Sequence, residues 1–236
     1  MARWIAPRMW EGGECWIIGG GPSMPLQFGV PEDVIQGVYN KELPMSAYSP
    51  FLSPIHGKHV IGVNAAFLLG NWIDVVFFGD GGFYFGNKET LDACPKLKVS
   101  CNPNMRNKAN VFDVKYMDRN GNHPMGMSKV PGYVSWNLNS GAAAINLAYH
   151  FGAKKIYLLG FDMQLGPAGN QHWHHHYVKG SFIKKNDPKA LPFHRHLAGF
   201  TMLANDAKKA EIEIINISPD SAITAFPRVS LKEVIG

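Results

Sequence analysis

The sequence predicts a protein of the α/β class, with a mostly parallel sheet flanked by helices and long lid loops. Two observations predict this class. Short apolar runs rich in β-branched and aromatic residues recur along the chain, and helical or loop stretches separate them. The 236 residues are 46% hydrophobic and 17% charged, which excludes a disordered chain and suits one domain over residues 1–236.

Seven apolar runs are predicted to be strands. None approaches the roughly 18 apolar residues that a membrane-spanning helix requires, so we expect no membrane span. The runs cover residues 15–18, 59–63, 74–78, 97–101, 111–116, 155–159 and 212–217.

Two helices are marked by their sequence patterns. Ser140 is expected to cap a helix over residues 141–151, which ends at Gly152 and leads into a strand. A second helix is predicted over residues 194–210, because its apolar residues fall on one stripe. Each of the two predicted helices is followed by a predicted strand.

Two long stretches, residues 30–56 and 117–136, are rich in Gly, Pro, Asn and Met and show little periodicity. Long irregular segments in a domain of this size are usually lids or binding loops. We predict that both serve such a purpose.

Charge and cysteine content favour a protein of the cytoplasm with an anionic ligand. The formal net charge is +5, without a basic run, which does not indicate a nucleic-acid-binding face. The three cysteines are odd in number and lack metal-ligand spacing, which is typical of a reducing compartment.

A glycine triplet, Gly19–Gly21, follows the first predicted strand and precedes Pro22 and Ser23. Backbone amides at such a helix start bind phosphate. Met24 stands where the dinucleotide motif has a glycine, and no Lys-Ser/Thr pair follows, so NAD, FAD and a Walker-type phosphate loop are not predicted. A tight turn without a ligand is the alternative interpretation.

Polar residues end three other predicted strands: Asn64, Asp80 and Asp162. Ligands of open α/β sheets bind beyond the carboxyl ends of strands, so we predict that these side chains face a ligand. Each of them also suits a turn or loop-stabilising role.

The start of the helix at Asn139, Ser140 and Gly141 is a candidate anion site, although a plain N-cap explains Ser140 equally well. His172 and the histidines at 174–176 form a cluster without a metal-binding motif. We predict no metal there, and expect one or two of these imidazoles to contact a phosphate or sugar.

Four motifs occur together in one order: IIGGGPS from residue 17, GVNAAF from 62, NSGAAAINLAYHFGAKKIYLLGFD from 139 and INISPDSAITAFP from 215. This pattern resembles the family-42 sialyltransferases of bacterial surface glycans and the wider MptE-like group, named for a 6-hydroxymethylpterin pyrophosphokinase and found also in phage genomes. The resemblance implies a Rossmann-like sheet with a small lid and a nucleotide-activated donor such as a CMP sugar.

The resemblance also implies roles for individual residues. The family's general base is a histidine at a fixed distance before an Asp-Ser pair, which places it at His194 when counted back from Asp220. His196 is the neighbouring rival, and Asp162 is the second predicted catalytic residue. The predicted donor-binding residues are Gly20, Gly21, Ser23, Asn64, Asp80, Asn139, Ser140, Gly141, His172 and Ser221.

The predicted function is transfer from a nucleotide-activated donor, as in a glycosyltransferase whose histidine base acts on an acceptor hydroxyl. No cofactor is required for it, and the family's donor-phosphate tyrosines are replaced by Gln164 and by Gly169–Asn170, which leaves the donor's base and sugar open. One alternative is an MptE-like diphosphokinase that uses ATP with Mg²⁺ at Asp80 and Asp162. The other is a non-catalytic nucleotide-binding phage protein.

The acceptor is a glycan, a small molecule or a modified DNA base on this interpretation. A homo-oligomer is compatible with the sequence. The resemblance places the protein in the cytoplasm of a bacterial or phage-infected cell.

Overall fold

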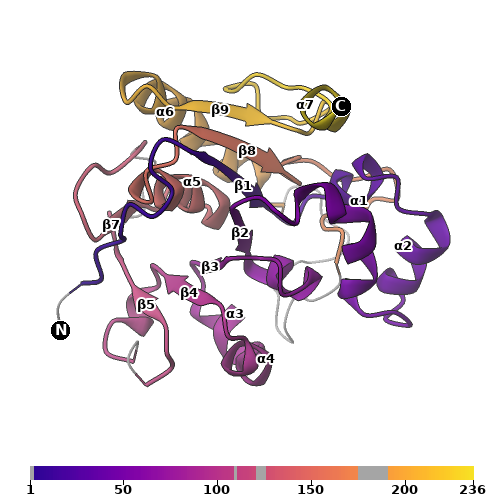
Figure 1. Cartoon of the computed structure of the whole chain (residues 1–236), viewed down its shortest axis with the longest axis horizontal. Coiled ribbons are helices and arrows are strands. Elements are labelled where there is room, and N and C mark those ends of the chain that lie inside the picture. Colours follow the sequence, from indigo (N-terminus) through magenta and orange to yellow (C-terminus); the bar gives the residue numbers. More distant parts are fainter. Residues whose placement is uncertain (1–2, 109–110, 121–125, 175–190) are drawn as a thin grey trace.

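A seven-stranded parallel sheet forms the centre of the computed structural model, which describes residues 3–108, 111–120, 126–174 and 191–236. Its order is β5-β4-β3-β2-β1-β8-β9, and every neighbouring pair is parallel (Figure 1). The predicted α/β class is therefore confirmed. The strands are β1 (Glu14–Ile18), β2 (Val60–Val63), β3 (Val75–Phe78), β4 (Leu97–Ser100), β5 (Lys115–Tyr116), β8 (Lys155–Leu159) and β9 (Glu213–Asn216).

Each strand lies within a predicted apolar run or begins one residue before it, and the fifth run differs most from its prediction. Only Lys115–Tyr116 pair with β4, because residues 111–113 form a turn in which Asp113 has a φ of 49°. Val111 is 78% exposed. Val111 thus lies in a surface turn beside a short edge strand.

The helices lie on both faces of the sheet. They are α1 (Ser23–Gln27), α2 (Glu32–Tyr39), α3 (Gly81–Gly86), α4 (Lys88–Ala93), α5 (Ser140–His150), α6 (Phe193–Lys209) and α7 (Leu231–Ile235). The last two long helices, α5 and α6, confirm the two helices predicted from the sequence, and each ends one residue earlier than predicted.

The prediction that residues 30–56 form an irregular loop is wrong. This stretch contains α2 and a 3₁₀-helical segment, Met45–Ile55, in which Met45, Tyr48, Leu52 and Ile55 are buried. Pro50 and Pro54 lie inside that segment and remove backbone donors, which explains why it lacks the pattern of an α-helix.

Residues 117–136 are not wholly irregular either. Two short strands, β6 (Asp118–Asn120) and β7 (Tyr133–Ser135), pair in parallel and form a small second sheet. Residues 121–125 between them lie outside the described residues. A lid role for either stretch stays a prediction.

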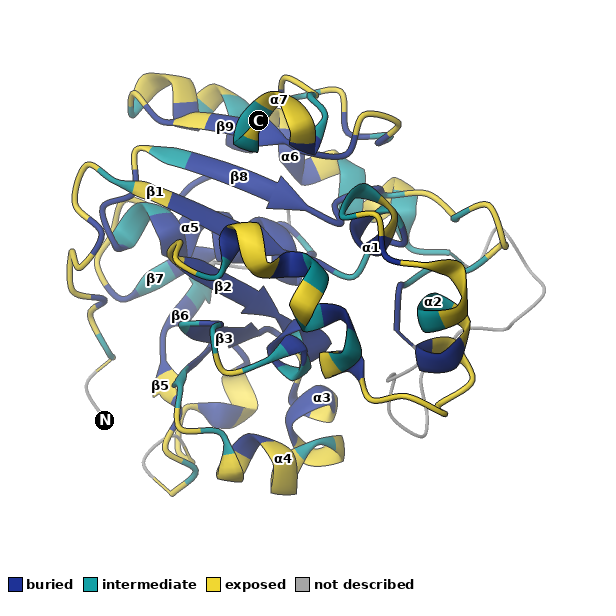
Figure 2. Ribbon diagram, turned by 45° about the vertical axis from the view of Figure 1, so that its right-hand side comes forward, coloured by how far each residue is buried: buried dark blue, intermediate teal, exposed yellow. Residues whose placement is uncertain are grey.

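Alternate strand residues build one core on each face of the sheet. Ile17, Ile61 and Leu158 face the core that contains α5 and the buried side of α6. Trp16, Ile18 and their neighbours face a second core that contains the 3₁₀-helical segment and residues of α1 to α4. Figure 2 shows these strands as buried and the outer faces of the helices as exposed.

The order in which the chain adds strands to the sheet reverses between β1 and β8. From β1 the next strand is β2 on one side, and from β8 the next strand is β9 on the other side. A crevice opens at such a switch point, beyond the carboxyl ends of the two strands. No helix within the described ranges combines the length and the apolar character needed to cross a membrane.

Candidate functional site

A cavity of about 780 Å³ lies at the switch point. The loops after β1, β2, β3 and β8 contribute to its walls, together with the starts of α5 and α6. The structure brings together most of the predicted site residues here: Gly20, Gly21, Asn64, Asp80, Asn139, Ser140, Gly141, Asp162 and His172. Ser23, Ser221 and His194 do not line it.

The glycine triplet is packed against the end of β8. The amide of Gly21 donates to the carbonyl of Gly160 at 2.7 Å. A Cβ on Gly21 would lie 2.6 Å from that same oxygen, and a Cβ on Gly19 would lie 2.7 Å from it. The close approach of the two turns therefore requires glycine, whether or not a phosphate binds there.

Asp162 connects the end of β8 to the start of α1. Its Oδ2 accepts from the Ser23 backbone amide at 2.7 Å and its Oδ1 from the Ser23 hydroxyl at 2.5 Å. The same hydroxyl accepts from Gln27 Nε2 at 3.0 Å and lies 3.2 Å from the Ser218 hydroxyl. The side chains of Asp162 and Ser23 hydrogen-bond to each other, so their geometry supports a positioning role.

Ser221 fixes the other side of the same turn. Its hydroxyl donates to the Phe161 carbonyl at 2.6 Å, and the side chain is buried. The amide of Ala222 donates to the Asp162 carbonyl at 2.8 Å. The late Asp-Ser motif thus holds the backbone that carries Asp162.

Asn139, and not Ser140, caps α5. The Asn139 Oδ1 accepts from the amides of Gly141 at 2.7 Å and Ala142 at 3.3 Å. The predicted cap was one residue too late, because Ser140 already has helical geometry. Two of the amides at this helix start are consequently bound to the protein itself, although the helix dipole still favours an anion nearby.

Asn64 lies in the wall of the cavity. It follows β2 with a φ of 52°, and its Oδ1 is buried without a hydrogen-bond partner among the described residues. Buried polar atoms are normally satisfied. A role of Asn64 in ligand binding stays a prediction.

Asp80 follows β3, the neighbour of β2 in the sheet, and it lines the cavity with its side chain exposed to solvent. Partial desolvation raises the pKa of its carboxyl group, whereas Arg119 and Arg195 lower it. Arg119 stacks on the indole of Trp136, with its guanidinium 4.5 Å from the ring centroid. Trp136 and Arg195 line the cavity, so both signs of charge are present around this part of it.

Two histidines cover the glycine turn. The amide of Trp173 donates to the Gly20 carbonyl at 3.0 Å, and its indole donates to the Gly19 carbonyl at 2.8 Å. Trp173 therefore fixes His172 and His174 over the turn, and their rings stack with centroids 5.3 Å apart. Burial, assisted by the nearby His196, lowers the pKa of His172 to about 4.

The histidines at the start of α6 differ in position. His194 is exposed and does not line the cavity, whereas His196 is half-buried and does. Burial, followed by the charges of Arg195 and His194, lowers the pKa of His196 to about 4. His196 is thus a neutral imidazole at pH 7 with access to a ligand.

Sequence reasoning missed the apolar wall of the cavity. Trp136 and Leu138 lie in or beside a stretch that was interpreted as a loop, so no periodicity marked them. Phe161 and Met163 flank Asp162, and the strand-end rule would have found them had it been applied to apolar side chains. Phe193, at the start of α6, completes this wall.

No three His, Cys, Asp or Glu side chains in the described ranges are placed to hold a metal ion together. His175 and His176 of the predicted cluster lie outside the described residues.

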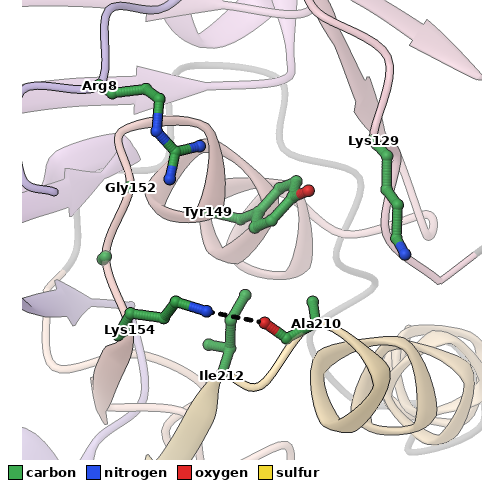
Figure 3. A pocket seen from close by; sticks show the side chains of 8 residues that line it. Arg8, Lys129, Tyr149, Gly152, Lys154, Ala210 and Ile212 are labelled. Carbon is green, nitrogen blue, oxygen red and sulfur yellow. Dashed lines mark hydrogen bonds between the residues drawn. The ribbon is translucent and has the colours of Figure 1, made fainter. Parts of the chain in front are cut away.

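A second, smaller pocket of about 200 Å³ lies near the amino ends of β8 and β9 (Figure 3). Arg8, Lys129 and Lys154 line it, but Lys154 Nζ donates to the Ala210 carbonyl at 3.1 Å and so closes the end of α6. Arg8 forms an ion pair with Glu11. No predicted site residue lies there.

Solved glycosyltransferase structures share the fold. The MAf glycosyltransferase from Magnetospirillum magneticum AMB-1 matches with a TM-score of 0.56 at 15% identity, over 97% of this chain and 35% of that one. The sialyltransferase CstII from Campylobacter jejuni, in complex with the substrate analogue cytidine 5′-monophosphate, matches with a TM-score of 0.50 at 14% identity, over 92% of this chain and 84% of that one.

The same sialyltransferase in complex with CMP-3FNeuAc gives a TM-score of 0.50 at 15% identity. The chain thus spans about a third of the MAf protein and most of the sialyltransferase. No protein-family model and no curated protein sequence matches the chain. At these identities the similarity concerns the fold, and it agrees with the predicted Rossmann-like sheet.

Proposed function

We propose that this protein is a transferase with a nucleotide-activated donor, and that it is a glycosyltransferase. The observation that carries the proposal is the cavity at the switch point, where Gly20, Asn64 and the start of α5 meet. A volume of about 780 Å³ suits a nucleotide sugar, since ligand sites typically measure roughly 300–1,000 Å³. The fold shared with two glycosyltransferases supports the same choice.

In the proposed reaction, an acceptor hydroxyl attacks the anomeric carbon of the donor sugar. A bond forms between the acceptor oxygen and the anomeric carbon, and the bond between that carbon and the donor's phosphate oxygen breaks. The nucleotide leaves with the electron pair of the broken bond. The hydroxyl proton passes to a general base, and we assign this role to His196 in place of His194. His196 lines the cavity, and His194 is exposed outside its lining.

The chemistry of the cavity supports a neutral imidazole base. With a pKa lowered to about 4, His196 is unprotonated at neutral pH and is able to accept a proton. Burial makes it a weak base in the empty site. A bound phosphate places a negative charge nearby, which favours the imidazolium and strengthens the base when the donor is present.

The diphosphokinase alternative requires a pair of carboxylates for Mg²⁺, and Asp80 and Asp162 were its candidates. Both oxygens of Asp162 accept hydrogen bonds from Ser23. Asp162 is thus already engaged in joining the end of β8 to the start of α1, and this positioning role favours the transferase.

The proposal is tested first by ligand binding. Thermal unfolding is followed with CMP, UMP, GDP and ATP, each with and without Mg²⁺, because a ligand at 100 times its dissociation constant adds about 2.7 kcal/mol of stability. We expect one nucleotide to raise the melting temperature without Mg²⁺. A rise only for ATP with Mg²⁺ would favour the diphosphokinase.

The second step measures chemistry. Nucleotide release is followed from CMP-, UDP- and GDP-sugars that carry the preferred base, with glycan, small-alcohol and hydroxymethylated-DNA acceptors. Acceptor-dependent release supports the transferase. Nucleotide binding without release from any donor would support the non-catalytic alternative, and no binding at all would contradict the proposal.

A further inference from the structure

Left-handed backbone conformations of non-glycine residues gather at the cavity. Asn64, Leu138 and Met163 line it with φ values of 52°, 55° and 52°, and Asn137 beside them has a φ of 48°. Asparagine tolerates this region, but leucine and methionine rarely adopt it. Such strain persists where the surrounding structure enforces it, and it is concentrated at functional sites.

The surroundings of Leu138 enforce its conformation. The preceding Asn137 is fully buried, its Nδ2 donates to the Gly126 carbonyl at 2.8 Å, and its Oδ1 accepts from the Gly126 amide at 3.1 Å. α6 closes on it from outside, since a Cβ on Gly199 would lie 2.6 Å from the Asn137 Cβ. The following Asn139 is fixed as the cap of α5.

The surroundings of Met163 are equally restrictive. The preceding Asp162 is held by Ser23 through its side chain and by Ala222 through its carbonyl. The following Gln164 donates from Nε2 to the Asp220 carbonyl at 2.5 Å. The fold therefore holds Met163 in place from both sides.

The two strained side chains line the same cavity and pack against the same core. Leu138 and Met163 are half-buried, and both pack against the core beneath α5 and α6 while they line the cavity. Asn139, which follows Leu138 in the chain, has its Nδ2 at 4.0 Å from Met163 Sδ. The cavity also has polar lining residues, among them Asn64 and His172, and His172 lies against Gly20 of the glycine turn.

We propose that Leu138 and Met163 form an apolar clamp that holds the base of the nucleotide. The sugar-phosphate part then lies toward the polar lining residues and the glycine turn. A pocket that pairs apolar contact with a few polar groups gains affinity from the first and orientation from the second. This inference rests on the proposed function, and it adds the residues that contact the base.

The test separates the base from the sugar phosphate. Binding of CMP, UMP, GMP, AMP and ribose 5-phosphate is measured by titration calorimetry for the wild type, Leu138→Asn and Met163→Asn. Asparagine accepts a left-handed backbone and removes the apolar side chain. We expect the best nucleoside monophosphate to bind each variant about ten-fold more weakly, which corresponds to roughly 1.4 kcal/mol, and ribose 5-phosphate to bind as before.

Glu211→Asn is the matched control. Glu211 has a φ of 55°, is exposed and does not line the cavity, so the substitution relieves the same strain without a change in affinity. Circular dichroism verifies that each variant is folded. If Leu138→Asn is unfolded, the clamp is tested with Met163→Asn alone.

The two proposals fail in different ways. A wild type that binds no nucleotide overturns the proposed function. A wild type that binds nucleotide while both folded variants bind it equally well overturns the clamp. Equal losses for the nucleotide and for ribose 5-phosphate also overturn it, because the base would then not be what the clamp contacts.

Discussion

Ser23 donates two hydrogen bonds to Asp162, from its backbone amide to Oδ2 at 2.7 Å and from its hydroxyl to Oδ1 at 2.5 Å. The two residues are 139 positions apart in the chain. They join the turn after β1 to the end of β8, the two strands on either side of the switch point. This serine and this aspartate therefore help to set the shape of the cavity at this point.

Asp162→Asn should lower the free energy of unfolding by about 2–3 kcal/mol, because hydrogen bonds to a charged group are the stronger ones and an amide turns one oxygen into a donor facing Ser23. Urea unfolding followed by tryptophan fluorescence measures this change. Asp220→Asn is the control, since Asp220 is exposed and such substitutions change stability by only about 0.5 kcal/mol. Equal effects of the two substitutions would contradict the role given to this pair.

Gly21→Ala should destabilise the protein severely, because its Cβ would lie 2.7 Å from the Asp162 Cγ and even closer to the Gly160 oxygen. Overpacking of this kind typically costs about 1–3 kcal/mol or more. Gly57→Ala is the matched change, because nothing lies within 4 Å of its Cβ position. Melting temperatures compare the two, and a Gly21→Ala variant as stable as Gly57→Ala would show that the turn is looser than described.

Asn139→Ala should cost about 1 kcal/mol, within the range of roughly 0.5–2 kcal/mol for loss of an N-cap. It removes the acceptor for the amides of Gly141 and Ala142. Ser140→Ala should change stability much less, because its side chain does not cap α5. Chemical denaturation of both variants decides between the two possible caps, and a larger loss for Ser140→Ala would reverse the assignment.

The sheet was predictable because its strands are short apolar runs that are rich in β-branched and aromatic residues and are separated by helical or loop stretches. The cap and the helix propensity of the sequence located α5, and periodicity located α6, each within one residue. The cap of α5 was misplaced by one residue because Asn139 and Ser140 are both good caps, and only the backbone conformation distinguishes them: Asn139 is extended and Ser140 is helical.

The candidate site was predictable where polar residues end strands, as at Asn64, Asp80 and Asp162. It was not predictable where tertiary contacts decide the role of a residue. His194 and His196 have equivalent local sequences, and the packing of α6 alone brings His196 to the cavity. Leu138 and Met163 give no sequence signal, because their placement depends on strained backbone that distant residues enforce.

The unfolding free energy should depend on pH through His172 and His196. Both have pKa values lowered from 6.5 to about 4, so the unfolded chain binds more protons than the folded one between these pH values. Their contribution is therefore complete above pH 6.5 and is lost as the pH falls toward 4. We expect the wild type to lose roughly 2–3 kcal/mol more than His172→Asn/His196→Asn between pH 7.5 and 4.5, with screening of the half-buried His196 included.

Urea unfolding at pH 7.5, 5.5 and 4.5 measures this difference. The titration of Asp80 changes the unfolding free energy in the opposite direction, because the pKa of its carboxyl group is raised. Comparison with the double variant cancels this contribution and that of the other carboxyl groups. Parallel pH dependences of the wild type and the double variant would contradict the prediction.

The final prediction concerns the general base. His196→Ala should lower kcat by roughly 10²–10⁴, the usual contribution of a general base, and should leave nucleotide affinity within about three-fold, because the base acts on the acceptor. His194→Ala is the matched control two residues away, and we expect near wild-type turnover, since His194 is exposed and does not line the cavity.

The pH profile adds a readout that a purely structural role of His196 would not change. In the wild type, kcat/KM should fall on the acid side near the lowered pKa of about 4, because this ratio reports the free enzyme. The acid limb of kcat should lie at higher pH, since the bound phosphate favours the imidazolium. Both limbs should disappear in the residual activity of His196→Gln. Loss of activity in His194→Ala with full activity in His196→Ala would move the base by two residues, and full activity in both would remove a histidine of α6 from the mechanism.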